Sequence, residues 1–154
     1  MIVVTGGAGF IGSAIAQELN TRERADLIIV DDIDHPEKEK NIASIKYQEL
    51  IGKNYFLEKI LDRDIKPIDV IIHMGACSST TETDENFLTK NNYHYTRHLA
   101  TCALEKSIRF IYASSAATYG NGKMGYSDDE SKLKTLKPLN FYGKSKHKFD
   151  LWAE

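Results

Sequence analysis

Residues 2–12 read Ile2-Val3-Val4-Thr5-Gly6-Gly7-Ala8-Gly9-Phe10-Ile11-Gly12 and predict a strand, a tight glycine turn and the start of a helix. The β-branched run at the front is typical of a strand that is buried on both faces. Apolar residues at positions 11, 15 and 19 share one side of the predicted helix. Between a strand and a helix, this glycine spacing indicates a dinucleotide-binding turn. We expect Gly6, Gly9 and Gly12 to let the backbone approach a pyrophosphate at the helix N-terminus.

The rest of the chain alternates short apolar runs with longer helical patterns, which is typical of βαβ units and a parallel sheet. We predict further strands at residues 27–30, 45–47, 70–73 and 110–113, and helices at residues 55–61, 91–106 and from 141 onward. The polar stretches around residues 34–46 and 120–138 are predicted to be loops. The predicted fold class is therefore α/β, a doubly wound parallel sheet of the Rossmann type, with residues 1–154 forming one dinucleotide-binding domain.

Composition favours an ordinary globular protein over a nucleic-acid or membrane protein. The net charge of −2 gives no excess of positive charge to attract nucleic acid or an anionic membrane. No apolar run is long enough to cross a bilayer, and the two cysteines are too few for a disulfide framework or a metal cage. Because Met1 leads directly into the first predicted strand, we expect no signal peptide and a cytoplasmic location.

Two acidic residues, Asp31 and Asp32, end the second predicted strand. A carboxylate at this place typically accepts a hydrogen bond from the ribose 2′-hydroxyl of NAD and repels a 2′-phosphate. Lys38, Lys40 and Lys53 follow, and their positive charges can compensate for that repulsion. The residues themselves therefore leave both NADP and NAD open as the cofactor.

A tyrosine and a lysine, Tyr142 and Lys146, lie four residues apart on the last predicted helix and so share one of its faces. A tyrosine with the ordinary pKa near 10 is a poor base at neutral pH, but a nearby ammonium favours the phenolate. Ser115 follows the strand predicted at 110–113, at the sheet edge where α/β folds bind ligands. We predict that these three residues are catalytic in a reaction that moves a hydride and a proton.

Four other residues carry chemistry that we interpret as structural. His73 ends an apolar strand and is interpreted as a buried histidine with a hydrogen-bond partner. Cys77 has no evident base in the sequence, and its small neighbours suit close packing under a cofactor. His94 and His98 have the i, i+4 spacing of half a metal site, but without a third ligand in register we assign them to a helix surface and predict no metal.

The glycine turn, the Ser115 region and Tyr142-x-x-x-Lys146 together resemble the extended short-chain dehydrogenase/reductase superfamily, especially its nucleotide-sugar epimerases. Within that group the chain more closely resembles the epimerases of ADP-heptose, and the resemblance extends along essentially its whole length. The most specific run is Gly75-Ala76-Cys77-Ser78-Ser79-Thr80-Thr81, which is supported by Asn91-Asn92-Tyr93 and by residues 112–120.

This resemblance implies epimerisation at C6 of ADP-heptose through a transient keto intermediate, which supplies heptose for the lipopolysaccharide inner core. It implies bound NADP and a nucleotide-sugar substrate, with Tyr142 as an acid/base and Ser115 positioning the reacting oxygen. We also expect a homo-oligomer, because the last predicted helix would expose an apolar face that promotes association. The implied cofactor contacts are Phe10, Ile11, Asp31, Asp32, Lys38, Lys53, Met74, Gly75, Ala76, Cys77, Ser78, Asn91 and Lys146. Two positions depart from the family: Asp32 stands where members often carry Asn, and Met74 replaces an acidic residue.

Family members continue into a substrate domain that supplies a second catalytic lysine. Because nothing follows Glu154, we expect this chain to be the cofactor-binding half, with the substrate domain absent and no epimerase activity of its own. Two alternatives stay open at this point. The chain could belong to another nucleotide-sugar epimerase or dehydratase, or it could be a non-catalytic dinucleotide-binding module.

Overall fold

The computed structural model describes residues 1–62 and 65–154. The chain folds as two compact units. The first unit consists of Met1–Gly75 and His98–Tyr112 and contains the β-sheet. The second unit consists of Ala76–Arg97 and Ala113–Glu154 and is built from helices and loops.

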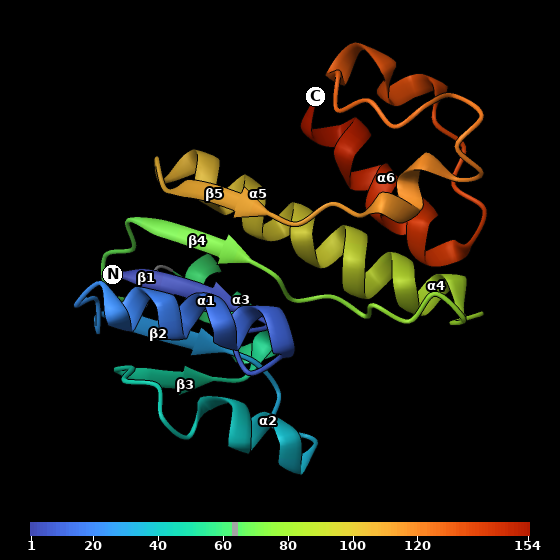
Figure 1. Ribbon diagram of the computed structural model, residues 1–154. Coiled ribbons are helices and arrows are strands. Elements are labelled where there is room, and N and C mark those ends of the chain that lie inside the picture. The colour runs from blue at the N-terminus through green and yellow to red at the C-terminus, as the bar shows by residue number, and fades with distance from the viewer. Residues whose placement is uncertain (63–64) are drawn as a thin grey trace. The chain divides into compact units, whose positions relative to one another are not determined.

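Five parallel strands form the sheet of the first unit, in the order β3-β2-β1-β4-β5, and Figure 1 shows their arrows pointing the same way. Their bounds are β1 Ile2–Thr5, β2 Leu27–Val30, β3 Glu49–Ile51, β4 Val70–His73 and β5 Arg109–Tyr112. Val4 of β1 pairs with Ile29 of β2 and with Ile72 of β4. The strand order reverses between β1 and β4, which is the switch point at which such sheets bind ligands. The predicted α/β class with a Rossmann-type sheet is confirmed.

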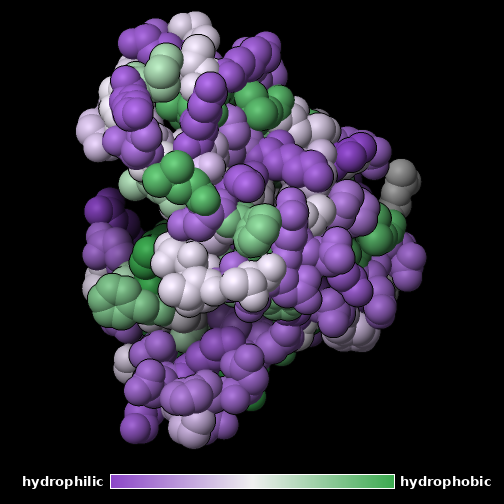
Figure 2. All heavy atoms as spheres, turned by 90° about the vertical axis from the view of Figure 1, so that its right-hand side faces the viewer, coloured by the Kyte–Doolittle hydropathy of each residue, from purple (hydrophilic) through white to green (hydrophobic). Residues whose placement is uncertain are grey.

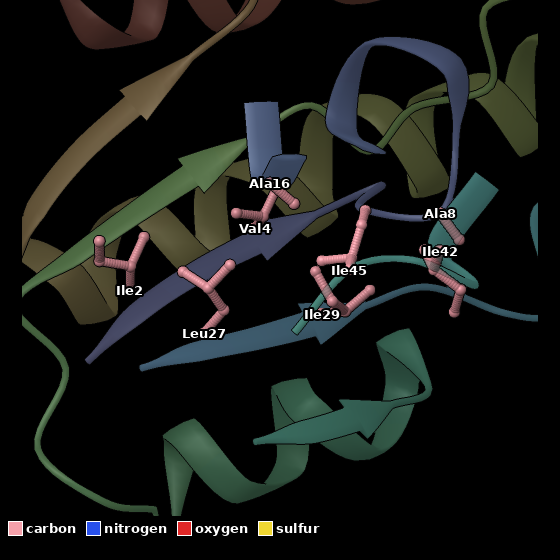
Figure 3. Packing of buried hydrophobic residues seen from close by; sticks show 8 residues of the cluster. All are labelled: Ile2, Val4, Ala8, Ala16, Leu27, Ile29, Ile42 and Ile45. Carbon is pink, nitrogen blue, oxygen red and sulfur yellow. The ribbon is translucent and has the colours of Figure 1, made fainter. Parts of the chain in front are cut away.

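One face of the sheet packs against α1 (Phe10–Thr21) and α2 (Pro36–Ile42). Because side chains alternate along a strand, every second residue of β1 and β2 points to this face. The resulting apolar cluster, seen in Figure 3, consists of Ile2, Val4, Ala8, Ala16, Leu27, Ile29, Ile42 and Ile45. Its burial removes apolar surface from water and anchors α1, whose N-terminus therefore has a fixed place at the end of β1.

The opposite face carries Val3, Ile28 and Ile71, which lie side by side in register and are fully buried. The helix α3 (Lys53–Leu61) buries Phe56 and Ile60, four residues apart on one of its sides. Figure 1 shows α1 in front of the sheet and α3 behind it. Covering both faces explains why the central strands are continuous apolar runs.

Two predictions for residues 34–51 were wrong. The third strand lies at Glu49–Ile51, whereas the apolar Ile45 at the predicted position is buried in the cluster beside α2. The predicted loop contains the helix α2, which begins with Pro36 and is capped by the side chain of His35. Both elements bury a single side chain each, Ile51 and Ile42, and one buried residue produces no apolar periodicity.

The second unit is built around α6 (Phe141–Ala153), which packs against four short elements. These are α4 (Glu85–Leu88), the π-helix η1 (Thr89–His94), and the 3₁₀-helices η2 (Ala116–Tyr119) and η3 (Glu130–Thr135). The helix α5 (Tyr95–Glu105) continues from η1. The single helix predicted at 91–106 is therefore a π-helical segment followed by α5, and the loop predicted at 120–138 contains η3.

Figure 2 shows one face of the molecule, on which hydrophilic side chains predominate and apolar groups lie in separate patches. Within residues 1–62 and 65–154, no helix is both long and apolar enough to cross a membrane.

Candidate functional site

The glycine turn between β1 and α1 has a geometry that only glycine fits. Gly6 has φ +64°, and a Cβ atom added to it would lie 2.7 Å from the Cα of Gly75. A Cβ atom on Gly12 would lie 2.1 Å from the carbonyl oxygen of Gly6. The Gly6 N–H donates to the Val30 carbonyl at 2.8 Å, which fixes the turn to β2. The sequence prediction that these glycines serve a tight turn agrees with this geometry.

The N-terminus of α1 is open to an anion. Its N-cap is Gly9, which offers no side-chain cap, and its first turn contains no acidic residue. The first N–H groups of a helix have no partner within the helix, and together with the helix dipole they attract negative charge. Phe10 and Ile11 are 88% and 61% exposed, so two consecutive large apolar side chains face solvent at the start of this helix. These features fit a pyrophosphate with apolar groups beside it.

Asp31 supports this turn directly. Its Oδ2 accepts a hydrogen bond from the Ala8 N–H at 3.0 Å, and its Oδ1 lies 3.0 Å from the Lys38 Nζ. Burial alone would lower the pKa of Lys38, but hydrogen bonds to Asp34 and Asp31 outweigh burial and raise it. Asn41, which the sequence reading missed, donates to the Ala8 carbonyl at 2.9 Å from α2. The end of β2 and the helix α2 therefore hold Ala8 by both its N–H and its carbonyl.

Asp32 is held in a second carboxylate–lysine pair. Its Oδ1 accepts the backbone N–H of Lys53 at 3.1 Å, and its Oδ2 lies 3.5 Å from the Lys53 Nζ. Four of the five residues predicted near the ribose are thus brought together as Asp31 with Lys38 and Asp32 with Lys53, whereas Lys40 is exposed on α2. Each of these two ammonium groups therefore faces a carboxylate.

The end of β4 packs onto the glycine turn. The Gly75 N–H donates to the Thr5 hydroxyl at 3.2 Å, and a hydrogen bond of 2.5 Å joins that hydroxyl to His73 Nδ1. His73 is buried and its ring stacks on Phe110. The interpretation of His73 as a buried, hydrogen-bonded core residue is confirmed. The Met74 N–H donates to the Thr5 carbonyl, so Met74 continues the pairing of β4 with β1.

In the second unit, Asn92 holds the segment that contains Ala76, Cys77 and Ser78. Its Oδ1 accepts the Cys77 N–H at 2.9 Å, and its Nδ2 donates to the Cys77 carbonyl and to the Ser145 hydroxyl, at 3.0 and 3.1 Å. Asn91, the predicted contact, donates to Asn92 Oδ1 and is only half buried. The sequence reading missed Asn92, although both asparagines stand in the same short run. A π-helical turn such as η1 is frequent at functional sites.

Ser115 and Ser114 directly follow β5. The Ser115 hydroxyl accepts the Ala117 N–H at 3.2 Å and so caps η2. The Ser114 hydroxyl donates to Asp150 Oδ2 at 2.6 Å, which ties this segment to α6. Asp150 is buried and was not singled out from the sequence, although it lies one helical turn after Lys146.

Tyr142 and Lys146 both lie on α6, four residues apart as predicted. Asn140 caps the helix by accepting the Gly143 N–H at 2.7 Å, which fixes the first turn that carries Tyr142. A Cβ atom on Gly143 would lie 2.8 Å from the Ala117 carbonyl oxygen, so this glycine lets α6 pack closely against η2. Lys146 is 6% exposed. Burial lowers the pKa of its ammonium, and the charge of Asp150 acts against that shift.

The two remaining histidines of the sequence analysis lie on a helical surface, as interpreted from the sequence. His94 at the end of η1 and His98 on α5 are both exposed. Cys77 is a half-buried free thiol, and burial raises the pKa of the Cys102 thiol. Among residues 1–62 and 65–154, no group of three or more side chains has the arrangement of a metal site.

The family model of the NAD dependent epimerase/dehydratase family matches residues 2–154. The chain is 48% identical over 154 residues to the ADP-L-glycero-D-manno-heptose-6-epimerase of Nitratidesulfovibrio vulgaris, covering 99% of this chain and 48% of that protein. It is similar to the crystal structure of the same-named enzyme of Helicobacter pylori, with a TM-score of 0.84 and 30% identity, covering 99% of this chain and 49% of that one.

A dTDP-glucose 4,6-dehydratase from Streptomyces venezuelae, solved with NAD bound, has a TM-score of 0.83 and 25% identity. The match covers 99% of this chain and 50% of that one. The chain thus spans about half the length of the curated relatives and of the solved structures that it matches.

Proposed function

Because the chain belongs to the NAD dependent epimerase/dehydratase family, we propose that it is the dinucleotide-binding part of an enzyme that inverts C6 of ADP-heptose. The observation that carries this proposal is the 48% identity, over 99% of the chain, to a curated ADP-L-glycero-D-manno-heptose-6-epimerase. The substrate is then a nucleotide sugar, and the product is a heptose donor for the lipopolysaccharide inner core. A substrate domain and a second catalytic lysine belong to the remaining half of the full-length enzyme.

The first unit supplies the residues that would hold the dinucleotide. The glycine turn and the N–H groups of Phe10 and Ile11 would bind the pyrophosphate at the open N-terminus of α1. Asp31 and Asp32, with Lys38 and Lys53, would bind the adenosine ribose. We propose NADP as the cofactor, because both lysines already stand against this acidic pair, and NAD as the alternative.

The second unit supplies the proposed catalytic residues. Tyr142 would exchange a proton with the oxygen on C6, and Ser115 would donate a hydrogen bond to that oxygen. Lys146 would hold ribose hydroxyls and favour the phenolate of Tyr142 through its charge. When bound, the nicotinamide supplies the hydride chemistry at C6. The backbone of Met74, Gly75, Ala76, Cys77 and Ser78, with Asn91, completes the set of proposed cofactor contacts.

A deuterium experiment on the full-length protein tests the reaction. The protein is incubated in D₂O with ADP-D-glycero-D-manno-heptose, and NMR follows both the configuration and the deuterium content of C6. Hydride that leaves C6 and returns to it does not exchange with solvent, so the L-glycero product should carry hydrogen at C6. Deuterium at C6 would exclude this mechanism.

A second measurement tests the substrate. UDP-glucose and dTDP-glucose are offered in place of ADP-heptose, because a related structure is a dTDP-glucose dehydratase. We expect turnover of ADP-heptose only. Turnover of either hexose without ADP-heptose turnover would assign the protein to another nucleotide-sugar epimerase or dehydratase.

We also propose that the enzyme is cytoplasmic and homo-oligomeric. Light scattering of the full-length protein tests the oligomeric state.

A further inference from the structure

The proposed catalytic lysine is buried beside a carboxylate on the same helix. Lys146 and Asp150 are 6% and 5% exposed and lie four residues apart, so they share one face of α6. The same carboxylate accepts the Ser114 hydroxyl at 2.6 Å. Asp150 therefore connects α6 to the segment that carries Ser115, the predicted partner of the substrate oxygen.

Burial of an ammonium favours its neutral form, because the charge loses its hydration. Burial accordingly lowers the pKa of Lys146, and Asp150 is the charged group that opposes this effect. A neutral lysine could neither attract a phenolate nor donate to ribose hydroxyls as strongly as an ammonium does. The proposed roles of Lys146 thus depend on a counter-charge within the protein.

Most of the other charged or titratable groups near α6 are engaged elsewhere or exposed, but Tyr142 is half-buried and His147 is buried, with no hydrogen-bond partner for its Nδ1 among the described residues. Lys148 lies over the ring of Tyr93, the Tyr119 hydroxyl donates to Asp128, and Lys134 pairs with Glu154. The remaining such groups on α6 and on the elements that pack against it are Tyr142, Lys144, His147, Glu85, Lys90, His94, Glu130 and Lys132. Of all these, Asp150 is the one whose charge acts on Lys146.

We propose that Asp150 is a positioning residue of this site: its carboxylate holds Ser114 in place and keeps the buried Lys146 ammonium charged for Tyr142 and the cofactor. The role of a charged Lys146 in the reaction rests on the proposed function. The interactions of Asp150 with Lys146 and Ser114 are a property of the second unit itself. They can therefore be measured without cofactor or substrate.

The test is an NMR titration of the 154-residue chain with ¹³C-labelled lysine side chains, in which the Lys146 signal is assigned by its loss in Lys146→Met. In Asp150→Asn the side chain keeps an acceptor for Ser114 but loses its charge. We expect Lys146 to release its proton at a pH lower by about one unit or more than in the unchanged chain. Ser114→Ala is the matched control, because it removes the hydrogen bond and leaves the carboxylate, and it should not lower the titration midpoint of Lys146.

A folded Asp150→Asn chain with an unchanged Lys146 titration would overturn the proposal. If Asp150→Asn does not fold, the double variant Lys146→Met/Asp150→Asn decides. Regained folding shows that an unpaired buried ammonium caused the defect, as proposed, whereas continued unfolding assigns Asp150 a purely structural role. A chain with the expected titration shift but no affinity for either NADP or NAD would keep this role of Asp150 and remove the proposed function.

Discussion

The carboxylate of Asp31 accepts the backbone N–H of Ala8 at 3.0 Å, so the residue that follows β2 supports the glycine turn that follows β1. The aspartate side chain is 10% exposed and its other oxygen faces the Lys38 ammonium. An aspartate at this place is expected to serve the ribose of a dinucleotide. Here it also forms part of the framework that shapes the phosphate-binding turn.

We therefore expect Asp31→Ala to damage stability and binding together. The Ala8 N–H and the Lys38 ammonium would each lose a partner, at a cost of about 1–3 kcal/mol in the free energy of unfolding. Urea denaturation measures this loss, and titration with NADP and with NAD should show weaker binding of both. Asp32→Ala is the control, because Asp32 is half exposed and supports α3 rather than the turn. It should change the preference between NAD and NADP more than the stability, and equal effects of the two variants would contradict this distinction.

The glycine turn gives a second prediction, which separates two reasons why a position requires glycine: a positive φ and a lack of space for a Cβ atom. Gly6 has a positive φ and also meets the Gly75 backbone at 2.7 Å through an added Cβ. Gly125 has φ +81° with nothing within 4 Å of its added Cβ. Gly125→Ala should cost about 1–2 kcal/mol of stability through backbone strain alone. Gly6→Ala should cost clearly more, because a backbone contact cannot be relieved by a side-chain rotation.

A third alanine variant, Gly52→Ala, controls for the loss of glycine itself. Gly52 has φ −64°, and its added Cβ would lie 3.4 Å from Asp32 Oδ1, which is an ordinary contact. Its stability in urea should stay within about 0.5 kcal/mol of the unchanged chain or rise, since alanine restricts the unfolded state. An equal loss of stability in all three variants would refute the geometric explanation.

Acid should remove a defined contribution to stability at Asp26. A hydrogen bond from Arg24 lowers the pKa of Asp26 from 3.8 to about 2. Because the folded-state pKa lies below the unfolded one, the contribution is present above about pH 4 and disappears as the pH falls towards 2. Unfolding free energies measured at about pH 6 and pH 3 should therefore differ less for Asp26→Asn than for the unchanged chain. The same pH dependence in both chains would show that Asp26 does not contribute.

The sequence predicts the central sheet because β1 and β2 are fully buried and β4 is partly so, and each of the three strands carries at least three consecutive apolar residues. It does not predict β3 correctly, since this edge strand buries only Ile51. The helix α2 is missed for a similar reason, with Ile42 as its one buried residue. Pro36 at the first helical position is the signal that could have indicated its start.

The residues of the candidate site likewise fall into those that the sequence predicts and those that it does not. Gly6, Tyr142 and Lys146 are found from local spacing, because each motif lies within one turn or one helix. The supporting contacts are not found this way, since Asn92 reaches Ser145 across 53 residues of sequence. Asp150 is an intermediate case, because its spacing from Lys146 is readable but its burial and its bond to Ser114 are not.

The proposed chemistry predicts different outcomes for the two residues of the Tyr142–Lys146 pair in the full-length enzyme. Tyr142→Phe keeps the ring and deletes the oxygen that exchanges the proton. Epimerisation of ADP-heptose should then fall by about 100-fold or more, the usual scale for losing a general acid or base, while NADP binding survives. Lys146→Met should reduce both, because its ammonium serves the ribose as well as Tyr142. Lys148→Met is the control, since Lys148 is exposed and lies over the Tyr93 ring, and it should leave both measurements unchanged. Steady-state rates and NADP titrations on the three variants check these outcomes, and a Tyr142→Phe enzyme with full activity would exclude Tyr142 as the acid/base.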